Sequence, residues 1–186
     1  MDHRSLIRAS VLAREPVDDR ERASLRSFVE HFDVLLDPCN EHADDVHVTA
    51  SAILVGRRGV VLHLHKRLHR WLQPGGHIDA GELPWDAARR EAAEETGLSV
   101  ELPAGEPVLA HVDVHPGPRG HTHLDLRYIV VGADADPQPP PDESQDVRWF
   151  SWDEAMAISD PGLVGALRAA RPHFEVVDDE VSWVEP

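Results

Sequence analysis

The sequence predicts an α/β fold in which a mixed β-sheet lies between layers of helices and a helical extension comes first. The first observation is helical spacing over 83–96, which places one helix in the middle of the chain. The second is that segments with strand periodicity lie on both sides of this helix, as in an α/β sandwich. The third is that residues 1–40 repeat apolar side chains at helical rather than strand spacing.

The N-terminal extension is expected to be helical up to Pro38, which cannot continue a helix. Its apolar side chains at helical spacing are Leu25, Phe28, Val29, Phe32, Leu35 and Leu36. We expect this segment to cap the main domain or to form a homodimer surface, and not to fold alone. The chain is thus divided into an extension at 1–40, a main domain at 41–172 and an acidic tail at 173–186.

After the extension the period of the apolar residues changes to two, which indicates strands. The expected strands lie at 46–55, 60–65, 107–115, 121–131 and 146–151. A hairpin turn is expected at Gly56–Gly59 and a glycine-rich loop at 72–76, and Gly97 should end the central helix. Further along, short helices are expected at 152–158 and 162–171, a loop at 133–141 and partial order in the tail.

The composition limits the classes of partner. With 18 Lys and Arg against 34 Asp and Glu, the formal net charge is −16. A chain this acidic is not expected to bind nucleic acid through its phosphates or to attach to anionic membranes. A small phosphorylated molecule is the expected partner, provided that divalent cations offset the local repulsion of charge.

The compartment is predicted from two features. The single Cys39 cannot form an internal disulfide, which favours a reducing compartment, and we expect a half-buried thiol rather than a nucleophile. The N-terminus lacks the apolar core of a secretory signal, and no stretch approaches the roughly 20 apolar residues of a membrane span. The expected location is therefore cytoplasmic.

The central helix carries three glutamates that share one face. Because Glu91 lies three and four positions before Glu94 and Glu95, its side chain stands beside both of them. Clustered carboxylates repel each other unless a cation lies among them, and oxygen ligands favour Mg²⁺ or Mn²⁺ over zinc. The alternative is a solvated acidic surface, which is the usual explanation of a run of charges.

The spacing around these glutamates is specific over 76–98. The segment GHIDAGELPWDAARREAAEETGL fits the pattern Gly-x5-Glu-x7-Arg-Glu-Ala-x-Glu-Glu-x-Gly-Leu at every fixed position. A chance match of seven specified residues is expected on the order of once in a million chains of this length. Those residues are Gly76, Glu82, Arg90, Glu91, Glu94, Glu95 and Gly97. The chain therefore resembles the Nudix family, closely here and more loosely over 46–157.

The resemblance implies a Nudix-type α/β/α sandwich that hydrolyses a nucleoside diphosphate linked to another group. It also implies a Mg²⁺ cofactor, with Mn²⁺ as an alternative. The implied metal ligands are Glu91, Glu94 and Glu95, with help from the backbone carbonyl of Gly76. Bound metal would polarise one phosphorus and lower the pKa of the attacking water.

Further roles are implied for other residues of the motif and of a later loop. Arg90 is expected to orient the carboxylates through a salt bridge, with Glu82 as its partner. The general base in this family is either a motif glutamate, such as Glu91, or an acid from a distant loop. Here the loop candidates are Asp142 and Glu143, and the alternative is that both are exposed loop charges.

Three expected strands carry histidines in alternation with other side chains. The polar positions are His63 and His65, then His111, Asp113 and His115, then His121, His123, Asp125 and Arg127. A solvated sheet face, a substrate pocket and an additional transition-metal site are all open interpretations. We predict that Arg127, with His121 and His123, faces the substrate cleft, because an acidic enzyme needs fixed positive charge to hold an anionic substrate.

The positions of two tryptophans are predicted from the residues next to them in the sequence. Trp149 alternates with Val147 on a short strand and is expected in the core. Trp71 precedes the glycine-rich loop and is expected near the pocket, where packing is favoured over base stacking because large aromatic side chains usually belong to cores.

Two rival functions come from other classes. An isomerase of allylic diphosphates with the same fold uses a catalytic cysteine and usually a degenerate motif, whereas this motif is intact and Cys39 lies in the extension. A non-catalytic nucleotide sensor would usually lack a motif glutamate or carry a DNA-binding domain, and neither sign appears here. Hydrolysis of a diphosphate linkage is therefore the predicted function.

Overall fold

The computed structural model describes residues 2–177 and 180–183. Its helices are α1 (His3–Leu12), α2 (Asp19–Phe32), α3 (Pro84–Thr96), α4 (Trp152–Ile158) and α5 (Pro161–Ala170). Its strands are β1 (Val46–Gly56), β2 (Gly59–Leu64), β3 (Trp71–Leu72), β4 (Gly75–His77), β5 (Val100–Glu101), β6 (Leu109–Pro116), β7 (Thr122–Gly132), β8 (Val147–Phe150), β9 (Phe174–Val177) and β10 (Glu180–Trp183). Short 3-10 turns lie at Pro103–Gly105, Pro118–Gly120 and Arg171–His173.

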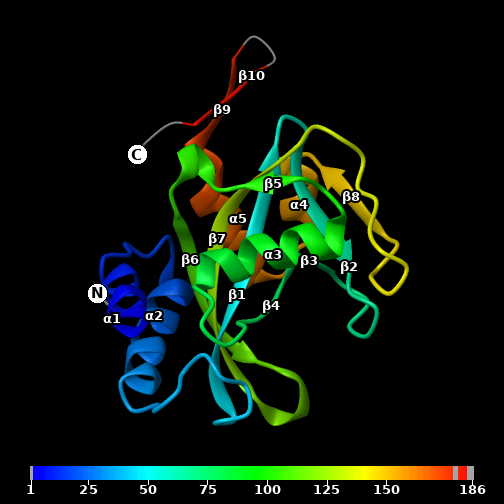
Figure 1. Ribbon diagram of the computed structural model, residues 1–186. Coiled ribbons are helices and arrows are strands. Elements are labelled where there is room, and N and C mark those ends of the chain that lie inside the picture. Colours follow the sequence, from blue (N-terminus) through cyan, green and yellow to red (C-terminus); the bar gives the residue numbers. More distant parts are fainter. Residues whose placement is uncertain (1, 178–179, 184–186) are drawn as a thin grey trace.

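The centre of the fold is a mixed sheet of eight strands within the described residues. Strands β1 and β7 run parallel from the pair Val46–Thr122 to the pair Val55–Val131, whereas the other neighbours pair antiparallel. Helix α3 lies over one face of this sheet, and α4 and α5 lie over the other (Figure 1). The predicted α/β/α sandwich with a mixed sheet is confirmed.

The glycine-rich segment before the motif at 76–98 contains more regular secondary structure than we predicted. The loop expected at 72–76 contains the short strands β3 and β4, and β4 pairs antiparallel with β1. Gly75 lies opposite Ser51, and a Cβ on Gly75 would collide with that serine. Backbone hydrogen bonds to β1 therefore fix the position of Gly75 and Gly76, a contact that local sequence signals do not reveal.

The extension forms two helices, not one helix reaching Pro38. It is interrupted around Pro16, whose ring fixes φ and removes a hydrogen-bond donor. Each helix begins at an aspartate whose carboxylate accepts a backbone N–H: Asp2 from Ser5, and Asp18 from Glu21. Helix α2 already ends at Phe32.

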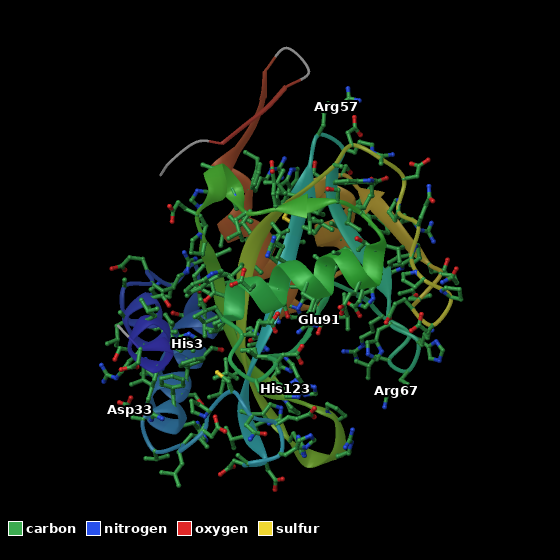
Figure 2. All side chains as sticks on the ribbon, viewed as in Figure 1. His3, Asp33, Arg57, Arg67, Glu91 and His123 are labelled. Atoms are coloured by element: carbon green, nitrogen blue, oxygen red, sulfur yellow. The ribbon has the colours of Figure 1, made fainter. Side chains whose placement is uncertain are left out.

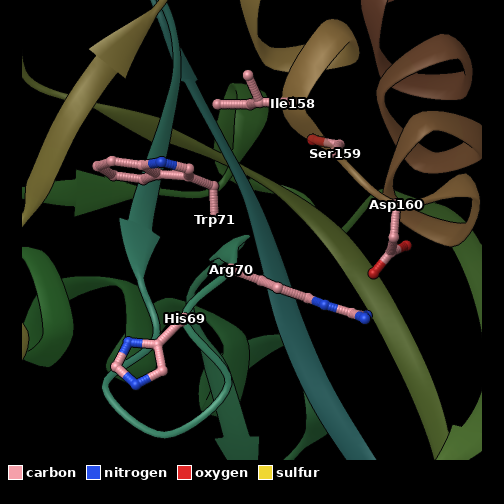
Figure 3. A pocket seen from close by; sticks show the side chains of 6 residues that line it. All are labelled: His69, Arg70, Trp71, Ile158, Ser159 and Asp160. Carbon is pink, nitrogen blue, oxygen red and sulfur yellow. The ribbon is translucent and has the colours of Figure 1, made fainter.

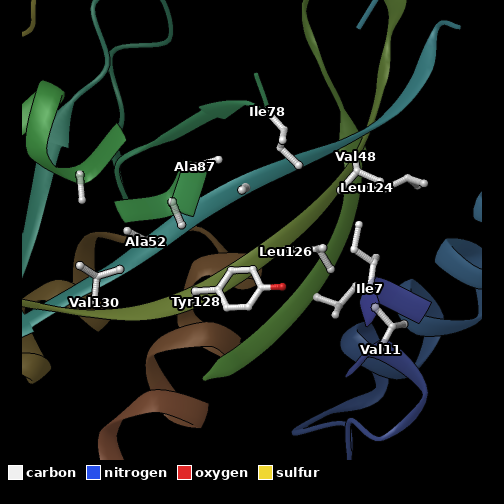
Figure 4. Close-up of a cluster of buried hydrophobic side chains, with 14 of the residues drawn as sticks. Ile7, Val11, Val48, Ala52, Ile78, Ala87, Leu124, Leu126, Tyr128 and Val130 are labelled. Atoms are coloured by element: carbon white, nitrogen blue, oxygen red, sulfur yellow. The ribbon is translucent and has the colours of Figure 1, made fainter. Parts of the chain in front are cut away.

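Both helices of the extension are part of the main core. Ile7 and Val11 of α1 are buried on the same side of the sheet as Leu124 and Leu126 of β7 (Figure 4). Phe28 of α2 is fully buried and stacks on Phe32 with ring centroids 5.3 Å apart. Burial of each such side chain contributes roughly 1.5–3 kcal/mol. The extension thus packs against the sheet and shares its core.

Helix α3 approaches the sheet closely because its inner face is made of alanines. Ala87, Ala88 and Ala92 are fully buried, and Glu91 and Glu95 lie three or four positions from them on the same side of the helix, where their carboxylates meet β4. The helix ends as predicted at Gly97, whose φ of +69° is left-handed and whose missing Cβ makes room for the backbone of Gln138.

The opposite face of the sheet packs against α4 and α5. Buried apolar residues there include Ile53, Leu62, Ile129, Leu163 and Leu167. No helix of the described residues has the length and apolar character needed to span a membrane.

Candidate active site

Arg90 is the centre of the polar network on α3. Its guanidinium donates to both carboxylate oxygens of Glu82 at 3.0 Å, so the salt bridge expected inside the motif is present. It also donates to Glu91 at 2.8 Å, to Glu94 at 3.2 Å and to the backbone carbonyl of His77 at 3.0 Å. One side chain therefore fixes three carboxylates relative to the strand β4.

The backbone of Gly75 and Gly76 lies directly against two of these acids. The N–H of Gly75 donates to Glu95 at 2.9 Å. A Cβ on Gly76 would lie 2.5 Å from a carboxylate oxygen of Glu91, so only glycine permits this approach. Glu91 and Glu95 are largely buried, with side chains 17% and 15% exposed, whereas Glu94 is 57% exposed and faces solvent.

Glu91, Glu94 and Glu95 form a carboxylate cluster whose electrostatics fit a bound divalent cation. Burial raises the pKa of Glu95 to about 8, and the neighbouring Glu91 and Glu143 add to the effect against the opposing N–H of Gly75. Burial likewise raises the pKa of Glu91, although Arg90 opposes it. Buried carboxylates this close resist ionising together unless positive charge lies among them. The oxygen donors favour a hard cation such as Mg²⁺ or Mn²⁺.

The loop before β8 brings a further acid to this cluster. Ser144 donates its hydroxyl to the carbonyl of Leu64 at 2.7 Å, and Lys66 donates to the carbonyl of Asp142. These contacts hold Glu143 near enough to Glu91 and Glu95 to raise the pKa of both. Asp142 is exposed on the same loop and is not among the main causes of either shift in pKa.

His63 also borders the site, although we did not predict a role for it there. Its Nδ1 lies 3.6 Å from a carboxylate oxygen of Glu95. Burial lowers the pKa of His63 to about 4, and the ring is therefore neutral at pH 7. Period-two alternation pointed to His63 as part of a polar strand face but did not indicate which element it would meet.

A basic loop and a pocket follow β2. Residues 65–70 read HKRLHR, and the side chains of Lys66, Arg67 and Arg70 are exposed. The adjoining cavity encloses about 280 Å³ and is lined by His69, Arg70, Trp71, Ile158, Ser159 and Asp160. Figure 3 shows the side chain of Arg70 extending across the cavity toward Asp160. This loop therefore concentrates positive charge beside the pocket.

Trp71 lines this pocket and is also packed. Its ring meets Phe150 edge to face, with centroids 4.9 Å apart, and the guanidinium of Arg148 lies 4.6 Å from its centre. Packing, which we favoured for Trp71, is thus observed. Trp149 is partly buried against the main core, and its indole N–H donates to the carbonyl of Ala135 at 2.8 Å.

The prediction that Arg127 faces an open cleft is wrong. Its side chain is only 5% exposed, and it donates to Asp125 at 2.8 Å and to Asp113 at 3.0 Å. Helices α2 and α5 cover this face of the sheet, and Arg20 of α2 forms a second ion pair with Asp113. Alternation correctly separated the two faces, but both of them are covered by helices.

The histidines of the polar strand faces on β6 and β7 lie away from the carboxylate cluster. His111 is fully buried next to Gly165 of α5. His121 and His123 contact the ring of His47, with centroids 5.1 Å away in each case. Figure 2 shows His123 on the lower part of the sheet, away from Glu91 on α3. Neither histidine has a described contact with the carboxylate cluster.

Cys39 is not placed for nucleophilic chemistry. It packs half-buried against the main core. Burial raises the pKa of its thiol to about 11, and Asp37 adds to the effect. A protonated thiol of this kind is unreactive.

Comparison with curated proteins finds several relatives of similar sequence. An RNA pyrophosphohydrolase of Rhodopseudomonas palustris is 27% identical over 145 residues, which are 72% of this chain and 84% of the relative. The asymmetrical bis(5'-nucleosyl)-tetraphosphatase of Caenorhabditis elegans is 28% identical over 103 residues, 53% of this chain and 71% of that protein. An isopentenyl-diphosphate Delta-isomerase of Streptomyces griseus is 29% identical over 153 residues, 74% of this chain and 77% of that protein.

Structural comparison and the family model agree with one another. A NUDIX-family hydrolase of Clostridium perfringens superposes with a TM-score of 0.57 and 31% identity, covering 68% of this chain and 97% of that structure. The model of the NUDIX domain matches residues 45–171, which contain every residue of the carboxylate cluster. The chain therefore belongs to the NUDIX family and is a Nudix hydrolase, an enzyme that cleaves diphosphate linkages.

Proposed function

We propose that this enzyme requires a divalent cation, Mg²⁺ in the first instance, and hydrolyses the diphosphate linkage of a small nucleoside diphosphate derivative. The observation that carries the proposal is the cluster of Glu91, Glu94 and Glu95, which Arg90 holds against the backbone of Gly75 and Gly76. Glu94, whose side chain is 57% exposed, leaves this group of hard oxygen ligands open to solvent.

The residues of this site have two kinds of role in the proposal, binding the cation and orienting the groups that bind it. Glu91, Glu94 and Glu95 hold the cation, and the carbonyl of Gly76 assists. A divalent cation bound there supplies charge stabilisation to the phosphoryl oxygens and lowers the pKa of a water. Arg90 keeps the carboxylates oriented through its contacts with Glu82, Glu91 and Glu94.

We assign the general base to Glu143. Glu91 already accepts from Arg90 at 2.8 Å and in this proposal also holds the cation, so both of its interactions oppose protonation. Glu143 is partly exposed, and its carboxylate accepts no hydrogen bond from the described residues, yet it is close enough to perturb Glu91 and Glu95. A free carboxylate beside the metal ligands is well placed to take a proton from the attacking water.

Replacing Glu143 by glutamine is expected to lower kcat about 100-fold, the lower end of the usual contribution of a general base. KM should change little, because the substitution keeps the shape of the side chain. Steady-state kinetics at saturating Mg²⁺ measure both constants. Asp142→Asn on the same loop is the matched control and should remain near wild type; equal losses in the two variants would rule out this assignment.

The substrate phosphates are proposed to meet the basic loop 65–70. The net charge of −16 opposes long nucleic acids, which need an extended basic surface. A small substrate needs only local positive charge, and Lys66, Arg67 and Arg70 provide it beside the pocket that Trp71 lines. A nucleoside with a short phosphate chain fits this arrangement better than an RNA.

Replacing Arg70 by alanine is expected to raise KM roughly tenfold and to leave kcat nearly unchanged, because the lost contact is shared by ground and transition states. Initial rates over a range of substrate concentrations separate the two constants. The control is Arg26→Ala, which removes an exposed arginine from α2, away from the pocket. An unchanged KM in Arg70→Ala would contradict the assignment of this loop.

The overall proposal is tested by product analysis of the full-length enzyme with Mg²⁺. The panel contains nucleoside triphosphates, dinucleoside polyphosphates, nucleotide sugars, ADP-ribose, 5'-triphosphorylated RNA and isopentenyl diphosphate. Cleavage of a small nucleotide supports the proposal, and RNA cleavage alone overturns the substrate class. Rearrangement of isopentenyl diphosphate without phosphate release would instead establish the isomerase alternative, against which the position of Cys39 argues.

A further inference from the structure

A second group of candidate metal ligands lies on the sheet outside the carboxylate cluster. Within the described residues, His47, His77 and His123 each offer a ligand atom, and these atoms all lie within 4.8 Å of one another. The three side chains come from β1, β4 and β7. Strand register explains their meeting, because His47 pairs with His123 and His77 pairs with Thr49, two residues further along β1.

Two of the rings have an oxygen acceptor beside Nδ1, which favours a proton on that nitrogen. Nδ1 of His47 lies 3.3 Å from the carbonyl of Asp44, which can only accept, so the proton is on Nδ1. Nδ1 of His77 lies 3.4 Å from a carboxylate oxygen of Glu41, an ion-pair distance at which the negative charge favours a proton on that nitrogen. In both rings Nε2 is left as a lone-pair donor. Histidines that bind metals are commonly oriented in this way, by a carbonyl or a carboxylate on the other nitrogen.

Two ring nitrogens of this group, one on His47 and one on His123, are buried and have no hydrogen-bond partner among the described residues. His47 is fully buried, and its Nε2 has no hydrogen-bond partner among the described residues. The same is true of Nε2 of His123. Buried polar atoms are normally paired, because an unsatisfied one costs its full desolvation free energy. A ligand that accepts electron pairs would satisfy both atoms at once.

We propose that His47, His77 and His123 bind a transition-metal cation of the zinc class, separate from the cation of the carboxylate cluster. Neutral imidazole nitrogens suit Zn²⁺, whereas Mg²⁺ prefers oxygen ligands. Three protein ligands leave a fourth position of a tetrahedral site for water. The site is independent of the proposed function, since none of its ligands belongs to the carboxylate cluster.

A cation bound at this site would join three strands next to Gly76, the first residue of the motif at 76–98. His77 directly follows Gly76, and its carbonyl accepts from Arg90 at 3.0 Å. A cation on the His77 ring would therefore tie the β4 backbone to β1 and β7 at the point where that backbone supports the carboxylate cluster. Its expected effect is stabilisation of the folded chain, because binding to the native state alone favours that state.

The test uses the full chain, stripped with a chelator, transferred to excess MgCl₂ and titrated with ZnCl₂. Bound zinc is measured by elemental analysis after gel filtration. Co²⁺ serves as a second probe, because its visible absorption distinguishes tetrahedral from octahedral coordination. We expect a single zinc ion per chain in the presence of Mg²⁺ and a tetrahedral Co²⁺ spectrum.

The variants separate this site from the rest of the protein. His123→Ala and His77→Gln should each weaken zinc binding by at least about 100-fold, and Glu41→Gln, which loses only the orienting carboxylate, by about tenfold. Two controls should bind like wild type: His3→Gln, an exposed histidine, and His111→Gln, a buried one outside the cluster. The double variant Glu91→Gln/Glu95→Gln should also keep its zinc.

Either of two results overturns the proposal. The first is wild-type protein that holds no zinc in excess Mg²⁺. The second is zinc that is lost from the Glu91→Gln/Glu95→Gln variant but kept by His77→Gln, which would place the ion on the carboxylates. His77 is 37% exposed, so its replacement preserves the fold, and urea unfolding of the metal-free variants verifies this. Added zinc should raise the unfolding midpoint of wild type and leave that of His77→Gln unchanged.

Discussion

Replacing Glu95 by glutamine is expected to lower kcat by about 100- to 1000-fold at saturating Mg²⁺, the loss typical of a key electrostatic group. The side chain keeps its size and can still accept from the N–H of Gly75, but it no longer carries the charge that holds the cation. Steady-state kinetics over a range of Mg²⁺ concentrations provide the measurement. Glu101→Gln, at an exposed position on β5, is the matched control and should retain normal activity.

The stability of the metal-free protein gives a second measurement on the same variant. Because the folded-state pKa of Glu95 is raised to about 8, above its unfolded value, its contribution to stability is full below about pH 4 and is lost as the pH rises through 8. Glu95→Gln should flatten this part of the pH profile of unfolding and should abolish stabilisation by Mg²⁺. Normal turnover together with an unchanged profile would remove Glu95 from the metal site.

The elements with strong local signals were predicted from the sequence. Helix α3 has both helical spacing and a C-terminal glycine, and the long strands β1 and β7 alternate clearly, so each was found with its bounds nearly correct. Strand β4 was not found, because three residues acquire strand geometry only through their pairing with β1. The break in the extension was missed because apolar spacing continues on both sides of Pro16.

Some residues of the candidate site could likewise be grouped from the sequence, and others could not. Glu91, Glu94 and Glu95 share a helix face by periodicity alone, so their grouping follows from the sequence. The approach of Glu143 depends on the contact of Ser144 with Leu64, and that of His63 depends on which face of β2 meets α3. Contacts between segments distant in the chain leave no periodic signal, and sequence reasoning could only name such residues as candidates.

The three polar strand faces show this limit most clearly. Alternation identified Asp113, Asp125 and Arg127 as members of one face, but not what covers that face. Helix α2 of the extension contributes Arg20 and Ser24 to Asp113 at distances of 3.0 and 3.4 Å, which closes the network against solvent. The extension therefore converts a face that we had assigned to substrate into part of the interior.

Replacing Arg127 by methionine is expected to reduce the free energy of unfolding by about 3–5 kcal/mol, the usual cost of leaving a buried charge without its partner. Burial alone would lower the pKa of Arg127, but Asp125 and Asp113 outweigh it and the pKa is raised. Asp125 also accepts from Thr49 at 3.1 Å and Ser51 at 2.8 Å, yet in the variant it loses the guanidinium that donates to it at 2.8 Å and keeps only His115, whose Nε2 is 3.9 Å away. Urea unfolding measures the loss, and Arg26→Met at an exposed position is the control.

The partner acids determine how this loss depends on pH and how it is rescued. Burial raises the pKa of Asp125, but Arg127, with help from His115 and Ser51, more than compensates and the pKa is lowered below its unfolded value. The stabilisation therefore exists above about pH 4 and disappears on acidification. The difference between wild type and Arg127→Met should therefore shrink at low pH. Adding Asp125→Asn to Arg127→Met should recover part of the stability at pH 7, because it removes the unpaired charge. A variant that unfolds like wild type but shows a raised KM would restore Arg127 to the substrate cleft.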